Sequence, residues 1–355
     1  MQIGIVRETK TLEGRVGLVP AAAGELVAAG HNVFIEKNAG ILSGYSDDHY
    51  QAAGVTVVDD AAALYQKARL IVKVKEPIAG DLALLREHHI LFSYLHLAAE
   101  LDLMRRLQTI GLTAVAFETV TDSSGRLPLL APMSDIAGRL ATQIGTTLLH
   151  QPQGGKGLLL GGLPAAERGR VVILGAGVAG GGAATLAAAL GAEVVVFDKQ
   201  RDRLAQVRAL GDNVTALYPY PEQIDQEVRR ADLLVGAVLV TGEKAPHLVS
   251  AEQVAGMAAG SVIVDIAVDQ GGCIETTQPT TYADPTYRVD DVVHFAVTNM
   301  PGAVPRTASQ ALSAALIPYV RALAEPGWEI HAGLHDGINV QAGQVIHPAL
   351  EQYVT

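Results

Sequence analysis

Residues 171–198 read VVILGAGVAGGGAATLAAALGAEVVVFD and spell out a strand, a glycine turn, a helix and a second strand in that order. Gly175, Gly177 and Gly180 have the spacing G-x-G-x-x-G where the first strand meets the helix. Glycines at this spacing let backbone N–H groups approach a pyrophosphate closely at a helix N-terminus. Asp198 ends the second strand, where a carboxylate would bind a ribose 2′-hydroxyl. The stretch therefore predicts a dinucleotide-binding βαβ unit.

The alternative interpretation of this stretch is a membrane span, because no charged residue occurs between Val171 and Glu193. The clustered glycines argue against it, since each costs about 1 kcal/mol in a helix interior. The β-branched residues also gather at the two ends of the stretch instead of running through it. A soluble βαβ unit accounts for both features.

Length and composition limit the classes of protein to which this chain can belong. A chain of 355 residues exceeds what one core usually covers, so two domains are expected, and 49% hydrophobic residues suffice to bury both. The net charge of −11 disfavours nucleic acid and anionic membranes as partners and favours small molecules and further copies of the chain. The single Cys273 and an N-terminus without a signal-peptide pattern predict a cytoplasmic protein. No metal is expected.

Short apolar runs alternate with helical patterns, which is typical of parallel sheets with helices on their faces. Strands are expected at residues 3–6, 32–36, 55–58, 70–74, 90–95, 113–117, 233–240, 261–267 and 292–297. We predict an α/β fold with two Rossmann-like doubly wound domains flanking a cleft, the N-terminal domain being discontinuous. Residues 1–128 and 307–355 would form a substrate domain, and residues 129–306 an NAD-binding domain. The C-terminal tail shows no further strand pattern and is expected to pack on the N-terminal half.

Two basic residues are candidates for binding a small substrate. Arg15, on a probable loop in LEGRVGLVP, has the planar fork that binds a carboxylate through two hydrogen bonds. Lys75 ends the run IVKVKEP, where an ammonium group can polarise a carbonyl oxygen or pair with a carboxylate. The alternatives are an ordinary exposed arginine and a solvated surface lysine.

Two further residues are candidates for proton transfer. His96 lies in the apolar run LFSYLHLAAE, where a satisfied core histidine is the alternative to an acid/base group. Asp265 and Asp269 follow an apolar strand in SVIVDIAVDQGGC, and a charge at such a place needs a partner or a function. We favour Asp269 as the reactive carboxylate, because the glycines that follow it permit close approach of a substrate. The passage VTNMPGAVPRT at residues 297–307 has two interpretations: a rigid wall beside a nicotinamide ring, or a plain connection between the two domains.

With these motifs together, the chain resembles the alanine dehydrogenase family over nearly its whole length. The blocks GIVRETKTLEGRVGLVP, IVKVKEP, LFSYLHLA, VDIAVDQGGC and HFAVTNMPGAVPRTASQAL match that family in order and at similar intervals. The resemblance implies reversible oxidative deamination of L-alanine to pyruvate and ammonium with NAD, in an enzyme that is usually hexameric. It makes Arg15 and Lys75 the substrate-binding pair and His96 and Asp269 the acid/base residues, with the first proton acceptor left open between the last two.

The resemblance also implies a set of coenzyme contacts, which join the glycine turn. They are Ser134, Gly175, Gly177, Val178, Gly180, Asp198, Arg203, Val238, Leu239, Ile266, Ala267, Val268, Asp269, Val297, Thr298, Asn299 and Met300. The chain departs from the family pattern at Gly181 and Gly182, at Gln278, and in YPYPEQI at residues 218–224, where a serine beside the adenine would be expected. Asp198 would repel a 2′-phosphate, which predicts a preference for NAD over NADP.

Three other functions are compatible with parts of the pattern. The NAD-binding component of a proton-translocating transhydrogenase shares the fold and the early motifs, but the His96 segment and the DQGG turn favour the dehydrogenase. Saccharopine dehydrogenases fit DQGGC and TNMPGAVPRT poorly. A silent NAD-binding protein would bind the coenzyme without turning over alanine. One methyl group in a pocket is worth only about 1–3 kcal/mol, so the sequence leaves alanine, serine, glycine and 2-aminobutyrate open as substrates.

Overall fold

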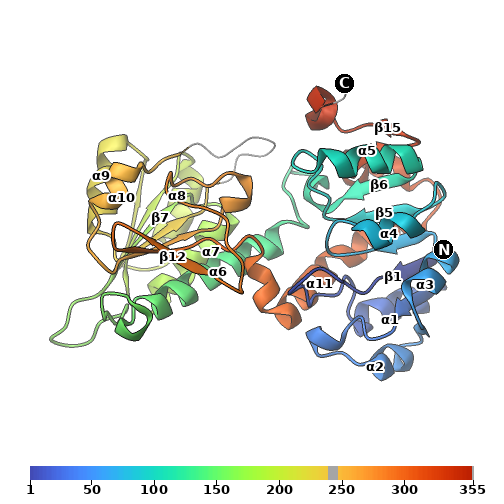
Figure 1. Cartoon of the computed structure of the whole chain (residues 1–355), viewed down its shortest axis with the longest axis horizontal. Coiled ribbons are helices and arrows are strands. Elements are labelled where there is room, and N and C mark those ends of the chain that lie inside the picture. Colours follow the sequence, from blue (N-terminus) through green and yellow to red (C-terminus); the bar gives the residue numbers. More distant parts are fainter. Residues whose placement is uncertain (239–246, 354–355) are drawn as a thin grey trace. The chain divides into compact units, whose positions relative to one another are not determined.

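The computed structural model describes residues 1–238 and 247–353 of the chain (Figure 1). The chain forms two compact units, one of Met1–Met133 with Gly302–Thr355 and the other of Ser134–Pro301. The chain passes from one unit to the other after Met133 and after Pro301, a few residues from the boundaries expected from the sequence. Among the described helices, none combines the length and apolar character that a bilayer span requires.

The first unit is built on a sheet whose described strands have the order β15-β14-β6-β5-β4-β1-β2-β3. Strands β1 to β6 run parallel, as the alternation of strand and helix patterns predicted. The strands are β1 (Gln2–Ile5), β2 (Asn32–Glu36), β3 (Thr56–Val58), β4 (Leu70–Val72), β5 (Ile90–Ser93), β6 (Thr113–Ala116), β14 (Ile338–Gln341) and β15 (Gln344–Val345). The helices are α1 (Pro20–Ala28), α2 (Asp47–Ala52), α3 (Ala61–Lys67), α4 (Ala79–Leu84), α5 (Leu101–Ile110), α11 (Pro305–Ala324) and α12 (Ala332–Gly337).

The prediction that the C-terminal tail holds no further strand is wrong. Strand β14 pairs antiparallel with β6, and β15 pairs antiparallel with β14. The four residues of β14 read INVQ, and the polar Asn339 among them obscures the strand pattern. Asn339 is nevertheless buried, because its amide donates to Thr119 Oγ1 at 2.8 Å and to the Gly337 carbonyl at 3.1 Å. The tail does pack on the N-terminal half, as expected.

The second unit is built on a sheet whose described strands have the order β12-β13-β11-β10-β7-β8-β9. The strands are β7 (Arg170–Leu174), β8 (Glu193–Phe197), β9 (Val214–Leu217), β10 (Leu233–Gly236), β11 (Val262–Asp265), β12 (Thr286–Val289) and β13 (Val292–Phe295). The helices are α6 (Ala131–Leu148), which begins in the first unit, α7 (Val178–Ala189), α8 (Arg201–Arg208), α9 (Pro221–Arg230) and α10 (Ala251–Ala255). Strands β9 and β12 were missed, because each is four residues long and only partly buried. The predicted strand at residues 233–240 ends at Gly236, and residues 239–246 lie outside the described residues.

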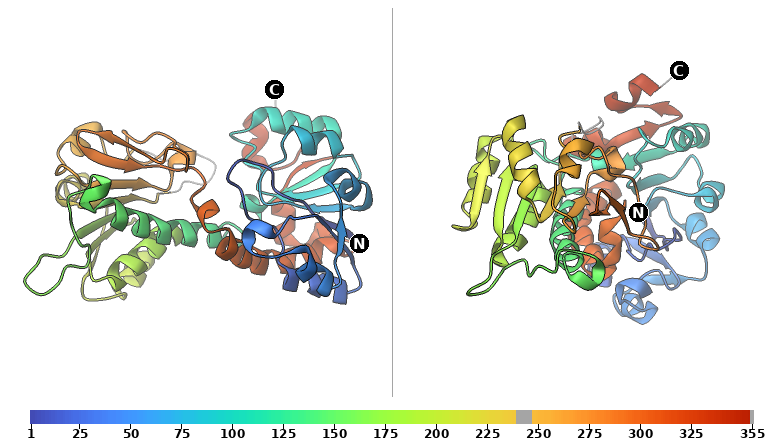
Figure 2. Two further views of the ribbon diagram at one scale, coloured as in Figure 1. Left: turned by 60° about the horizontal axis from the view of Figure 1, so that its bottom comes forward. Right: turned by 60° about the vertical axis from the view of Figure 1, so that its left-hand side comes forward.

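Helices cover both faces of each sheet (Figures 1 and 2). In the second unit α7 and α8 lie on one face, while α9 and α10 pack together on the other. Both units are therefore doubly wound, as predicted. The strand order reverses between β1 and β4 in the first unit and between β7 and β10 in the second. In sheets of this kind, ligands bind beyond the carboxyl ends of the strands at such a switch point.

The glycine turn of the second unit depends on close backbone packing. A Cβ atom on Gly180 would lie 1.7 Å from the Gly175 carbonyl oxygen, and Gly175 itself has a φ of +95°. A Cβ atom on the neighbouring Gly181 would meet no atom of the described residues within 4 Å. Only the first of these two adjacent helix glycines is required by the fold.

We expect Gly180→Ala to lower the free energy of unfolding by about 1–3 kcal/mol, the usual cost of overpacking a core. Gly181→Ala is the matched control and should leave stability unchanged or raise it by up to about 1 kcal/mol, because alanine favours the helix. Urea unfolding followed by circular dichroism measures both variants. Equal stabilities of the two variants would contradict the packing argument.

Candidate functional site

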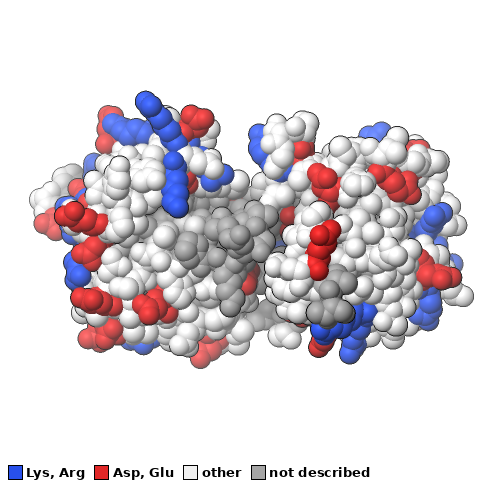
Figure 3. All heavy atoms as spheres, turned by 90° about the horizontal axis from the view of Figure 1, so that it is seen from above, with Lys and Arg blue, Asp and Glu red and all other residues white. Residues whose placement is uncertain are grey.

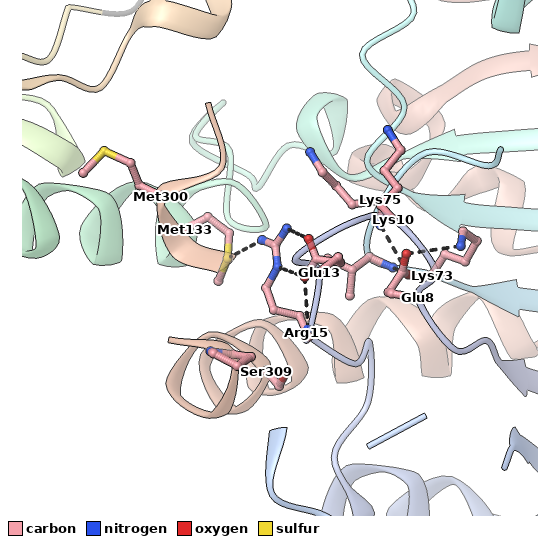
Figure 4. A network of polar contacts seen from close by, with 12 residues as sticks. Glu8, Lys10, Glu13, Arg15, Lys73, Lys75, Met133, Met300 and Ser309 are labelled. Atoms are coloured by element: carbon pink, nitrogen blue, oxygen red, sulfur yellow. Dashed lines mark hydrogen bonds and ion pairs between the residues drawn. The ribbon is translucent and has the colours of Figure 1, made fainter. Parts of the chain in front are cut away.

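Arg15 lies on the long loop that follows β1, at the switch point of the first unit, and its side chain is buried. Its Nε donates to Glu13 Oε1 at 2.7 Å and its Nη2 to Glu13 Oε2 at 2.6 Å. Its Nη1 approaches the Met133 sulfur at 3.3 Å (Figure 4). Burial alone would lower the pKa of Arg15, but the Glu13 carboxylate outweighs burial and raises it. The loop was predicted correctly, whereas the alternative of an exposed arginine is wrong.

Lys75 follows the neighbouring strand β4, and its side chain is 22% exposed beside Glu76. Two residues earlier in the chain, Lys73 is buried, and its Nζ lies 3.2 Å from Glu8 Oε2 and 3.4 Å from Asp81 Oδ2. Burial would lower the pKa of Lys73, but the two carboxylates outweigh burial and raise it. The two lysines therefore differ in role: Lys73 is a buried structural cation, and Lys75 is accessible.

Glu8 connects the loop after β1 to the segment after β4. Its Oε1 accepts the Val74 N–H at 2.7 Å and the Lys75 N–H at 3.4 Å, while its Oε2 accepts from Lys73. Figure 4 shows Glu8, which lies on the same loop as Arg15, beside Lys73. One buried carboxylate thus fixes the main chain at Lys75.

His96 was interpreted as part of an apolar strand, and the structure corrects this. Strand β5 ends at Ser93, and His96 follows on a loop with a φ of +50° and a side chain that is 42% exposed. Its N–H donates to Glu118 Oε1 at 2.6 Å, and its ring stacks on Tyr94 with centroids 5.9 Å apart. The hydroxyl of the buried Tyr94 donates to the Leu129 carbonyl at 2.7 Å. The imidazole is therefore accessible, and the interpretation as a core histidine is wrong.

These three residues come from the carboxyl ends of three strands that are adjacent in one sheet, β1, β4 and β5. A pocket of about 410 Å³ opens beside Arg15, at the ends of β1 and β2. Glu8, Glu13, Arg15 and Asn38 line part of it. The carboxyl edge of the first unit thus combines accessible and buried cations with an imidazole.

In the second unit, the glycine turn and Asp198 lie at the same sheet edge. Asp198 Oδ2 accepts the Ala176 N–H at 2.7 Å and Oδ1 accepts the Gln200 N–H at 2.7 Å. Arg203 Nη1 lies 3.8 Å from Asp198 Oδ2. A Cβ atom added to Gly177 would also lie 3.8 Å from Arg203 Nη1. Apart from its chain neighbours, no atom of the described residues lies closer to that Cβ position, and the helix α7 begins at Val178, which is 50% exposed.

Asp269 lies after β11, and the structure separates it from Asp265. Asp265 is buried and accepts hydrogen bonds from the Ala267 and Cys273 N–H groups, each at 3.0 Å, and from the Thr277 hydroxyl at 2.8 Å. Burial raises the pKa of Asp265. Asp269 is exposed on the 3₁₀ turn Val268–Gln270, so Asp265 holds the turn that presents Asp269.

The other predicted coenzyme contacts lie on the same elements of the second unit. Ile266, Ala267 and Val268 follow β11, and Val238 follows β10, whereas Leu239 lies outside the described residues. Val297, Thr298, Asn299 and Met300 follow β13, and Ser134 lies on α6. Of the described residues of this set, Ser134, Val178, Gly180 and Arg203 lie on α-helices, and the others follow the carboxyl ends of strands or belong to the glycine turn.

This edge fits a dinucleotide. The glycine turn carries only the methyl group of Ala176 next to the N-terminus of a helix of 12 residues, whose first N–H groups have no acceptor within the helix. Asp198 supplies a carboxylate at the end of the neighbouring strand. On the face shown in Figure 3, acidic and basic side chains are interspersed over both units.

Sequence reasoning missed the residues that hold the candidates in place: Glu8, Glu13, Tyr94 and Glu118. Glu13 was detectable, because it lies two residues before Arg15 and a buried arginine needs a carboxylate. Glu118 is 22 residues from His96 in sequence, and only the pairing of β5 with β6 brings them together.

The comparisons with known proteins agree with this arrangement. The alanine dehydrogenase/PNT N-terminal domain family matches residues 4–137, and the corresponding C-terminal domain family matches residues 141–348. The chain belongs to the alanine dehydrogenase/PNT family.

Relatives named alanine dehydrogenase match over nearly the full length. The Halomonas elongata protein is 46% identical, with 99% of this chain and 96% of the relative covered. The Bacillus subtilis protein is 45% identical, with 99% and 94% covered. A solved L-alanine dehydrogenase structure is 50% identical, with a TM-score of 0.95 and coverage of 99% and 98%. A transhydrogenase structure from Sinorhizobium meliloti is 25% identical, with a TM-score of 0.85 and coverage of 98% and 100%.

Proposed function

We propose that this chain is an NAD-dependent dehydrogenase that converts L-alanine reversibly to pyruvate and ammonium. The observation that carries the proposal is the nearly full-length likeness to proteins named alanine dehydrogenase. The site geometry supports it, because the first unit presents cations suited to a carboxylate and the second has a turn suited to a pyrophosphate.

Arg15 binds the substrate carboxylate in this proposal. Glu13 accepts hydrogen bonds from Nε and Nη2 and fixes the plane of the guanidinium. A planar guanidinium can bind a carboxylate through two parallel hydrogen bonds. Lys75 stabilises the carboxylate or the carbonyl oxygen that develops at Cα.

His96 and Asp269 are the acid/base residues of the proposal. His96 exchanges a proton with the amine or with the water that attacks the imine, and Asp269 orients or activates that water. Either group can take the first proton. NAD, when bound, accepts the hydride from the substrate Cα.

The coenzyme would be held by the second unit. Gly177, Val178 and Gly180 offer main-chain N–H groups to the pyrophosphate, while Gly175, whose N–H donates to the Phe197 carbonyl at 2.8 Å, lets the ligand approach the turn closely, and Asp198 and Arg203 lie beside the adenosine ribose. The proposal also includes Ser134, Val238, Leu239, residues 266–269 and residues 297–300 as contacts. We further propose that the protein works in the cytoplasm as an assembly of identical copies, six by analogy with the family.

The test is a spectrophotometric assay of NADH formation with L-alanine, L-serine, glycine and 2-aminobutyrate. We expect the highest kcat/KM with alanine and NAD, and weaker discrimination against NADP in Asp198→Ala, because the carboxylate that repels the 2′-phosphate is gone. Binding of NAD without turnover of any amino acid would contradict the dehydrogenase and favour a transhydrogenase-like component. Unchanged selection against NADP in Asp198→Ala would remove the assigned role of that carboxylate.

A further inference from the structure

Two buried serines contact the main chain of Arg15, one on each side of that residue. Ser43 ends a short 3₁₀ turn, and Ser309 lies in α11 (Figure 4). Both residues are fully buried. Ser43 Oγ donates to the Gly14 carbonyl at 2.8 Å, and Ser309 Oγ accepts the Val16 N–H at 2.9 Å. The two hydroxyl groups therefore contact both peptide units that flank Arg15.

Each of these hydroxyl groups has one hydrogen to donate, and both hydrogens are used. The Ser43 hydrogen goes to the Gly14 carbonyl, since the Pro305 carbonyl is more distant, at 3.2 Å. The two hydroxyl oxygens lie 2.8 Å apart, so Ser309 donates to Ser43 while it accepts from Val16. One chain of hydrogen bonds thus runs from the Val16 N–H to the Gly14 carbonyl.

This chain fixes the backbone at Arg15. The φ and ψ angles of a residue are set by the two rigid peptide planes that meet at its Cα atom. Glu13 adds a third contact, because its Oε1 accepts the Arg15 N–H at 3.0 Å, and the same carboxylate accepts from the guanidinium. Both the main chain and the side chain of Arg15 are therefore ordered by the first unit itself. Such ordering lowers the entropy cost of binding a ligand.

We propose that Ser43 and Ser309 are positioning residues for Arg15, which strengthen the binding of a substrate carboxylate without touching the substrate. The inference rests on the proposed function, because it takes Arg15 as the carboxylate-binding group. Alanine and pyruvate carry a carboxylate, whereas ammonium, the second substrate of the reverse reaction, has none. The reverse reaction therefore separates a positioning role from a general loss of packing.

Ser313 provides a matched control in the same helix. It lies one turn of α11 after Ser309 and is equally buried, and its Oγ accepts the Val19 N–H at 3.0 Å. Val19 ends the loop that carries Arg15, four residues further along the chain. Ser313→Ala therefore removes the same kind of hydrogen bond as Ser309→Ala but leaves both peptide units of Arg15 held.

The experiment measures steady-state kinetics of the full chain in both directions. Ser43→Ala and Ser309→Ala should each raise the KM for alanine and for pyruvate by about 2- to 10-fold, the factor that one hydrogen bond contributes to an equilibrium. The kcat should not change, because a loss of uniform binding raises KM alone. The KM for ammonium and the Kd of ADP-ribose should also stay the same. Ser313→Ala should match the unmodified chain in all these constants.

Three results would overturn the inference and leave the dehydrogenase standing: an unchanged KM for pyruvate in the variants of Ser43 and Ser309, an equal rise in Ser313→Ala, or a parallel rise in the KM for ammonium. The last two would make the serines part of the packing only. Circular dichroism checks that each variant is folded, and either serine variant alone suffices for the test. Failure of the unmodified chain to oxidise alanine would instead refute the proposed function.

Discussion

His96→Ala is expected to lower kcat for alanine oxidation by about 10²- to 10⁴-fold, the usual contribution of a positioned acid/base group. The imidazole is accessible on the loop after β5, and its backbone N–H is held by Glu118, so the loss of the ring removes proton transfer without removing a packed side chain. The Kd of ADP-ribose should not change, because His96 belongs to the first unit. Steady-state kinetics and calorimetry measure the two quantities.

His335→Ala is the matched control, because His335 is also an exposed histidine of the first unit. Its kcat should stay within a factor of two or so of the unmodified enzyme, as surface substitutions usually cost little. A kcat in His96→Ala comparable to that of the control would show that Asp269 or water carries the proton alone.

Glu13→Ala should destabilise the first unit by about 3–5 kcal/mol, because removing one partner of a buried ion pair leaves the other charge without its main compensation. The side chains of both Arg15 and Glu13 are almost fully buried, at 3% and 1% exposed, and they share two short hydrogen bonds. The same variant should also raise the KM for alanine, since Glu13 fixes the orientation of the guanidinium. Denaturant unfolding and steady-state kinetics report the two effects.

The double variant Glu13→Leu/Arg15→Met separates stability from function. Replacement of both charges by apolar side chains of similar volume is often neutral or stabilising, so the double variant should recover much of the lost unfolding free energy. It should remain inactive, because the carboxylate-binding group is gone. Recovery of alanine oxidation along with stability would show that Arg15 has no part in substrate binding.

The sequence was most informative where local pattern and function coincide. The glycine turn and its two strands were predictable, because the spacing of Gly175, Gly177 and Gly180 follows from contacts within one βαβ unit. The parallel strands of the first unit were likewise visible as apolar runs, since such strands are buried on both faces. The class of chemistry followed from the resemblance carried by five blocks of sequence, and the family models match both parts of the chain.

What the sequence could not supply depends on contacts between distant segments. The identity of Glu118 as the acceptor for the His96 N–H requires the pairing of two strands. The strand β14 is recognisable only through its pairing with β6, because two of its four residues are polar. The sequence favoured Asp269 over Asp265 through the glycines that follow it, but the burial of Asp265 and its hydrogen bonds to the turn are visible only in the structure.

The backbone at His96 has a consequence for attempts to evolve this protein in the laboratory. A residue with a β-carbon at a φ of +50° is held about 1–2 kcal/mol above a relaxed conformation, and glycine would avoid that strain. Selection for heat resistance therefore favours glycine at position 96, while the proposed role in proton transfer requires histidine. A library of variants screened only for stability at high temperature would therefore be enriched in variants with glycine at position 96, which lack the imidazole.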